Sequence, residues 1–143
     1  MKDILWEIGE TAHTLRRYYD RRVSAHGVTR SQWRVLARLE RAPGLKQVEL
    51  ADLLDIEPIT LSRIVDRLAA AGLVERVRDP DDRRAWRLEL TSAAAPLMAE
   101  LHEVADEVAA MALSGLGKTE LETMRDTLAA IRANVAEEEG KSA

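Results

Sequence analysis

The chain has 143 residues, of which 46% are hydrophobic and 32% charged, with a net charge of −4, a composition typical of a soluble globular protein. It has no cysteine, which excludes disulfides, thiolate metal sites and thiol redox sensing. No apolar run approaches the ~18 residues of a membrane span, and acidic residues stand where a signal peptide would be apolar, so we expect a cytoplasmic protein.

Two helices are predicted at the N-terminal end. Apolar residues recur every three or four positions over residues 4–24, which predicts a long helix that ends at Gly27. Thr29 and Gln32 then have the spacing of a capping box, in which the threonine hydroxyl accepts from the backbone and the glutamine reaches back. They predict the start of a second helix, which ends before residues 42–44.

A helix-turn-helix is predicted next. Residues 46–54 form a short helix and residues 55–57 a tight turn, and Pro58 suits the first position of a second helix. That helix runs to residue 71, where Gly72 ends it. Two short helices joined by a three-residue turn are typical of this motif, whose second helix enters the major groove of DNA.

A β-hairpin with a charged tip follows. Residues 73–78 favour a strand, residues 79–82 a tight turn, and residues 86–90 a half-buried strand with alternating apolar side chains. Five arginines gather around the turn, namely Arg76, Arg78, Arg83, Arg84 and Arg87. Arginine at a loop tip can enter a narrow minor groove. Three nearby aspartates leave open a merely solvated hairpin; we expect one of them, Asp82, to brace an arginine.

The C-terminal part is predicted to be helical from residue 92, with an interruption at residues 115–117. A second capping box, Thr119 to Glu122, opens the last helix, which should fray from residue 137 onward. The expected fold is mainly α with a small β-wing, in one domain over residues 1–143. Within it we expect a winged helix-turn-helix lobe at 28–91, a helical dimerisation region at 1–27 and 92–139, and a frayed tail at 140–143.

The uneven distribution of charge allows DNA binding despite the negative total. Residues 1–45 carry a net charge of +4, whereas residues 92–143 carry −6. A chain that approaches phosphates with one part can be acidic in another. The acidic excess therefore does not exclude a nucleic-acid partner.

The outward face of the second helix of the motif suits a DNA groove. Apolar residues on its other face are assigned to the core, which leaves outside Pro58, Ile59, Thr60, Ser62, Arg63 and Arg67. Hydroxyls, small apolar groups and an arginine that can fork onto guanine are what a major groove accepts. Any amphipathic helix also shows polar residues outside, so this face alone leaves both interpretations open.

The motifs together resemble the MarR family of transcriptional regulators. They are QWRVL at 32–36, QVELA at 47–51, TLSRIVDRL at 60–68, AGLVER at 71–76, and DPDDRRA at 79–85 closing on LELT at 88–91. They cover nearly the whole chain in the family's order and spacing. Where the family usually has a glycine, this chain has Ala94, followed by Pro96 and Leu97, which resembles the SlyA branch.

The resemblance implies a homodimer that binds a pseudo-palindromic operator, with Thr60, Ser62 and Arg63 in the major groove. It implies that Arg84 inserts in the minor groove with support from Asp82, and that Lys46 and Gln47 lie near phosphates. The full set of expected DNA contacts is Lys46, Gln47, Pro58, Ile59, Thr60, Ser62, Arg63, Arg67, Asp82, Arg83 and Arg84.

A dimer and a small-molecule effector are the further expectations. More apolar side chains are present than a winged motif can cover, namely Leu5, Trp6, Ile8, Leu97, Leu101, Leu116, Leu121, Met124, Leu128 and Ile131. One chain could bury these side chains against itself, whereas the resemblance implies that a second copy covers them.

The resemblance also implies a small aromatic acid as ligand. Cations beside flat rings suit such a ligand, and the candidates are His13, Arg16, Arg17, Tyr19 and Trp33. Alternatively, Trp33 belongs to the hydrophobic core, and Arg16 and Arg17 lie on a solvent-exposed helix face.

No catalytic or metal site is expected. The run Gly115 to Thr119 lacks the first glycine and the preceding strand of a phosphate-binding loop. The three histidines have no metal-ligand spacing, and no nucleophile or acid–base set stands out. We therefore expect a regulator without a cofactor or metal and not an enzyme. A protein-interaction module that uses the winged fold without DNA is the rival from another class.

Overall fold

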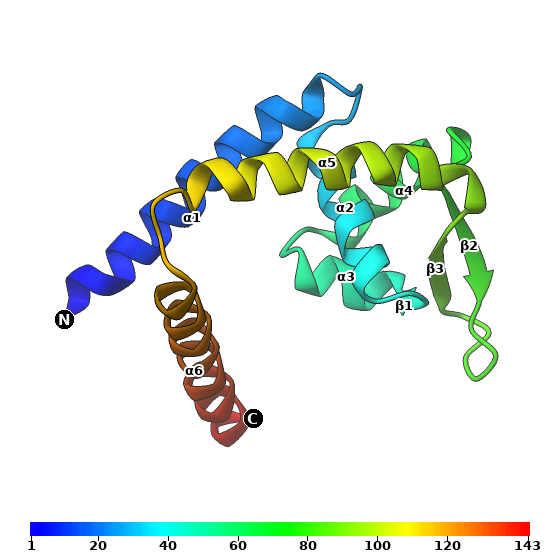
Figure 1. Cartoon of the computed structure of the whole chain (residues 1–143). Helices are drawn as coiled ribbons and strands as arrows, with labels where there is room; N and C mark the ends of the chain where they lie inside the picture. The colour runs from blue at the N-terminus through cyan, green and yellow to red at the C-terminus, as the bar shows by residue number, and fades with distance from the viewer. The chain divides into compact units, whose positions relative to one another are not determined.

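The computed structural model describes all 143 residues, as six α-helices and one small antiparallel sheet (Figure 1). The helices are α1 (Lys2–Ser24), α2 (Arg30–Arg41), α3 (Gln47–Leu53), α4 (Pro58–Ala70), α5 (Ala95–Ala112) and α6 (Lys118–Ser142). The strands are β1 (Leu45–Lys46), β2 (Val74–Arg78) and β3 (Trp86–Leu90), in the order β1-β3-β2, and a 3-10 turn, Ser92–Ala94, leads into α5. The mainly helical fold with a β-wing is as predicted.

The chain divides into two compact units, Met1–Val108 and Ala109–Ala143. The core of the first unit is formed by side chains with no exposed surface, among them Leu36 of α2, Leu61 of α4 and Leu88 of β3. α5 contributes to it with Met98, Leu101, Val104 and Val108, which recur every three or four residues. Leu101 therefore belongs to the core of its own chain, and its assignment to a surface that needs a partner was wrong.

Local signals explain where the first helices begin. The capping box of α2 is confirmed, because the Thr29 hydroxyl accepts from the Gln32 amide at 3.1 Å and the Gln32 side chain accepts from the Thr29 amide at 3.1 Å. The short strand β1 was not predicted. Lys46 has extended backbone and pairs with Arg87 of β3, so α3 begins one residue later than expected, with Glu49 accepting from the Lys46 amide.

Helix α6 differs from its prediction at both ends. It begins at Lys118 after an extended Gly117, which places Thr119 inside the first turn, and no side chain caps it. It also continues to Ser142 where fraying and a frayed tail were predicted. Lys141 pairs there with Glu137 at 3.1 Å and with Glu138 at 3.7 Å, which offsets the repulsion within the run of glutamates. None of the six helices combines the length and the apolar character that a membrane span requires.

Candidate nucleic-acid interface

A tight turn connects α3 to helix α4. Asp55 has φ +53°, a left-handed conformation that aspartate tolerates better than most residues, and the Ile56 amide donates to the Ala51 carbonyl at 3.1 Å. Glu57 is extended, and Pro58 occupies the first turn of α4, where its missing amide proton costs no hydrogen bond. The turn is therefore formed locally, as predicted, and it sets the direction in which α4 begins.

The two faces of α4 are clearly separated. Leu61, Val65 and Leu68 are buried, and Ile64 is half-buried against the core. Five of the six residues predicted on the outer face are exposed, namely Pro58, Ile59, Thr60, Arg63 and Arg67. Ser62 is half-buried. This face therefore offers a hydroxyl, guanidinium groups and an apolar side chain from one helix.

Arg76 of β2 joins three elements at the base of the wing rather than lying at its tip. Its guanidinium is 2.8 Å from a carboxylate oxygen of Asp66, and it donates to the Ser62 carbonyl at 3.1 Å and to the Gln47 side-chain oxygen at 3.1 Å. We call this set of contacts the Arg76 junction. It ties α3, α4 and β2 together and neutralises an acid on the outer face of α4. The side-chain oxygen of Gln47 is occupied by Arg76, so the side-chain nitrogen of Gln47 is the group that can donate to another partner.

The wing is organised around Asp79, whose side chain is buried. One of its carboxylate oxygens accepts from the amides of Asp81 at 2.8 Å and Asp82 at 3.0 Å, and the other accepts from Nε of Arg87 at 2.7 Å. The hydrogen bond from Arg87, followed by the one from the Asp81 amide, lowers the pKa of Asp79 to about 2. Asp79, the first residue of the turn, therefore faces inward and braces the side chain of Arg87, a contact that was not predicted. Asp82, the predicted brace, contacts Arg84 at its backbone amide.

Asp82 has a different role in the same turn. Its carboxylate accepts from the backbone amide of Arg84 at 3.0 Å and so holds the main chain under that residue. Arg78 lies over the ring of Trp86, 4.7 Å from its centroid, and donates to the Arg83 carbonyl at 2.7 Å. This contact of Trp86 was not predicted, although an aromatic residue across from Arg78 in the strand register is a usable signal. Trp86 and Arg78 stiffen the hairpin beneath its tip.

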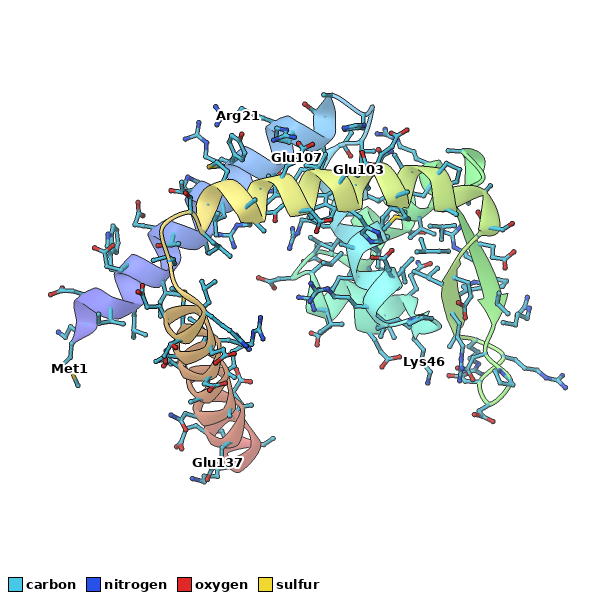
Figure 2. All side chains as sticks on the ribbon, in the orientation of Figure 1. Met1, Arg21, Lys46, Glu103, Glu107 and Glu137 are labelled. Carbon is cyan, nitrogen blue, oxygen red and sulfur yellow. The ribbon has the colours of Figure 1, made fainter.

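The remaining cations of the hairpin are free. Arg83 and Arg84 are exposed, and neither side chain has an ion pair or hydrogen bond within the chain. Lys46 is the last residue of β1 and pairs with Arg87 of β3, so it lies beside the wing (Figure 2). The structure therefore leaves two tip arginines and Lys46 available for anions, whereas Arg76 and Arg87 are already paired with acids.

A separate cavity of about 370 Å³ brings together two of the five residues predicted to bind a ligand. Arg16 of α1 and Trp33 of α2 line it, and Tyr19 stacks on Trp33 with 5.8 Å between ring centroids. His13 and Arg17 do not line it. Five further residues that were not predicted also line it, namely Arg34, Ala37, Arg38, Arg41 and Leu54. The spacing of the arginines on one face of α2 was the signal for them.

Lowering the pH is expected to destabilise the wing through Asp79. Because its pKa in the folded protein, about 2, lies below the ordinary 3.8, the carboxylate stabilises the folded state above about pH 4, and this contribution disappears as the pH falls toward 2. Asp79→Asn should have a lower Tm than the wild type at pH 7, and the difference should shrink between about pH 4 and 2. Circular dichroism melts at several pH values measure both. Asp81→Asn, in the same turn but exposed, is the control, and an unchanged Tm for Asp79→Asn at pH 7 would contradict the assignment.

Comparison with known proteins agrees with this geometry. The sequence profile described as MarR family matches residues 26–85. The crystal structure of transcriptional regulator PA3341 is 32% identical, with 94% of this chain and 98% of that chain covered and a TM-score of 0.84. A putative MarR family transcriptional regulator from Listeria monocytogenes, complexed with 26mer DNA, is 26% identical over 96% and 92%, with a TM-score of 0.82. The transcriptional regulator SlyA is 28% identical over 95% and 96%, with a TM-score of 0.78.

Proposed function

The chain belongs to the MarR family of transcriptional regulators, which are not enzymes, and we propose that it binds one operator sequence as a homodimer. In this proposal α4 enters the major groove and the wing enters the minor groove. Residues 28–91 form the DNA-binding lobe, and residues 1–27 and 92–139 the dimerisation region. The protein acts in the cytoplasm as a repressor, by occluding or remodelling a promoter.

The observation that carries this proposal is the joint exposure of two DNA-compatible surfaces on one lobe. The outer face of α4 presents Thr60 and Arg63, and the wing presents Arg83 and Arg84 without partners. The Arg76 junction fixes α4 and β2 to each other, so both surfaces approach a duplex as one body. The similar Listeria protein was solved with DNA, which supports the same kind of partner here.

A SlyA-like position within the family is part of the proposal. Ala94 stands where the family usually has a glycine, and it is buried in the 3-10 turn with its amide donating to the Thr91 carbonyl at 3.1 Å. This position has no positive φ, so it needs no glycine. The likeness to SlyA at 28% identity supports the same assignment.

The direct test is a gel shift with the DNA upstream of the protein's own gene and of its divergent neighbour, at a stated salt concentration with random DNA as competitor. We expect a shift that the competitor does not remove. If no upstream duplex shifts, selection from a random-sequence pool decides between an operator located elsewhere and a protein-interaction module. A pool that yields no enriched sequence would contradict the proposed function.

Arg63 is expected to read a base pair. Arg63→Ala should weaken binding to the operator by about 1–3 kcal/mol per contacted pair and relax the base preference there. Lys46→Ala is the matched comparison, because loss of a phosphate contact should weaken operator and random DNA alike and reduce the salt slope by about 1 for each subunit. Fluorescence anisotropy on both duplexes measures the difference. Equal losses on operator and random DNA for Arg63→Ala would refute the base-reading role.

Helix α6 supports the homodimer. It has 25 residues, none of them buried within the chain, although most helical stability in proteins comes from packing of an apolar face. Five apolar residues recur along it at alternating steps of three and four, and we call them the α6 seam: Leu121, Met124, Leu128, Ile131 and Val135. This spacing is that of a helix packed along another helix. Leu5 and Trp6 of α1 are exposed at 65% and 70% and add apolar surface of the same kind.

The arginine-lined cavity supports a small aromatic acid as effector. A carboxylate would pair with Arg16, and its ring would lie against Trp33. In calorimetry with benzoate as the probe, Arg16→Ala should weaken binding about tenfold or more. Benzamide, which lacks the charge, should bind less well than benzoate. Arg17→Ala, next in sequence but outside the cavity, is the matched control, and equal losses for both variants would place the ligand elsewhere.

A further inference from the structure

Ile59 is an exposed apolar side chain in the middle of a polar surface. It is 64% exposed and occupies the second position of α4. Successive helical residues are ~100° apart, so Ile59 and Arg63 point directly away from the buried set Leu61, Val65 and Leu68. The core therefore does not account for an isoleucine at this position.

We propose that Ile59 contacts the C5-methyl group of a thymine and makes the protein selective for thymine at that position of its operator. This inference rests on the proposed function, because it requires α4 to lie in the major groove. Of the base edges in that groove, only thymine presents a methyl group, and an apolar side chain is what recognises it. The contact removes apolar surface of both partners from water.

The start of α4 favours this contact. The ring of Pro58 restricts φ immediately before Ile59, so the direction of the helix start is set in advance. In helix-turn-helix proteins the N-terminal residues of this helix are the ones that reach the base edges. Asp66, about two turns further along the same face, is paired with Arg76 at 2.8 Å, so its negative charge is compensated as the helix approaches DNA.

Other exposed apolar residues of the lobe are less suited to this role. Val48 and Leu53 are exposed at 65% and 49%, but both belong to α3. The first helix of the motif crosses the sugar–phosphate backbone and does not enter the groove. Arg63 recognises hydrogen-bonding groups, and Thr60 offers a hydroxyl and a single methyl, a smaller apolar surface than the side chain of Ile59. Ile59 is thus the apolar residue of the motif that the helix geometry directs at base edges.

The test uses the full-length protein and a duplex that it selects from a random-sequence pool. Each thymine is replaced in turn, in both half-sites, by deoxyuridine, which lacks only the C5-methyl group. We expect one thymine at which the loss of the methyl weakens binding about threefold to fivefold per half-site, and roughly tenfold or more for both. Ile59→Ala should bind the thymine duplex more weakly by a similar factor and should not distinguish it from the deoxyuridine duplex.

Two further variants separate this contact from a general effect. Ile59→Val keeps a branched apolar side chain and should retain part of the methyl dependence. Val48→Ala, at an equally exposed apolar position, should retain all of it. A wild-type protein insensitive to every methyl, or an Ile59→Ala variant that remains sensitive, would overturn the inference. Failure to select any duplex would instead contradict the proposed function, so the two failures are distinguishable.

Discussion

Replacing Arg84 by alanine is expected to weaken operator binding by about 1–3 kcal/mol at each wing, which for two wings is a loss between ~30-fold and ~10⁴-fold. The side chain is exposed and has no partner in the chain, while Asp82 holds its backbone amide at 3.0 Å. Buried Asp79 fixes the turn beneath it. In the proposed complex, this braced turn carries the guanidinium into the minor groove, where the potential of DNA is most negative.

The measurement is the dissociation constant of the operator at fixed salt for wild type, Arg84→Ala and Arg84→Lys. Lysine keeps the charge without the planar fork and should recover only part of the affinity. Arg83→Ala is the control, because it removes an equally exposed cation from the same tip. If Arg83→Ala and Arg84→Ala have equal effects, and changing A·T flanks to G·C does not matter to the wild type, the wing acts by charge alone and does not read groove width.

Placing glutamate on the α6 seam is expected to separate the dimer and to lower operator affinity by about 10²–10⁴-fold. Two lobes on one dimer make the second half-site contact intramolecular, and a monomer loses that advantage. Leu128→Glu introduces a charge in the middle of the seam. Sedimentation equilibrium measures the mass, and a gel shift measures the affinity.

Ala133→Glu is the matched control for the seam. It introduces the same charge on the same helix, at an exposed position on the side opposite the α6 seam. It should remain a dimer with full affinity. A Leu128→Glu variant that is still a dimer and still binds normally would show that the subunits meet through another surface, such as the exposed start of α1.

Much of the fold could be predicted because its signals are local. The capping box at Thr29, Pro58 at the start of α4, and Gly72 with φ +77° after it are each recognisable within a few residues. Strand β1 was missed because two residues carry no periodicity. Leu45 pairs with Leu88, far along the chain, so the strand exists only through tertiary contact.

The candidate interface was predictable as a helix face but not as a set of side-chain pairs. Helical periodicity alone identified five exposed residues of α4, although the sixth, Ser62, is half-buried. Which arginine pairs with which acid depends on how separate elements pack together. The sequence alone does not distinguish the wing arginines from one another, because they are the same residue type in one short segment. The structure distinguishes them: Arg76 is paired with Asp66, Arg87 with Asp79, and Arg84 is free. A similar limit applies to the cavity: spacing places Arg38 and Arg41 on one face of α2, but this face lines a cavity only because α1 packs against α2.

The Arg76 junction also has a consequence for changing the DNA sequence that the protein recognises. The Arg76 guanidinium contacts Ser62 at a shorter distance through the main-chain carbonyl than through the hydroxyl, and any amino acid at this position has that carbonyl. The side chains that face outward, Ile59, Thr60 and Arg63, take no part in it. They can therefore be exchanged without loosening the attachment of α4 to the wing. A library randomised at these three positions should yield folded proteins with new operator preferences, whereas randomising Arg76 or Asp66 should yield few.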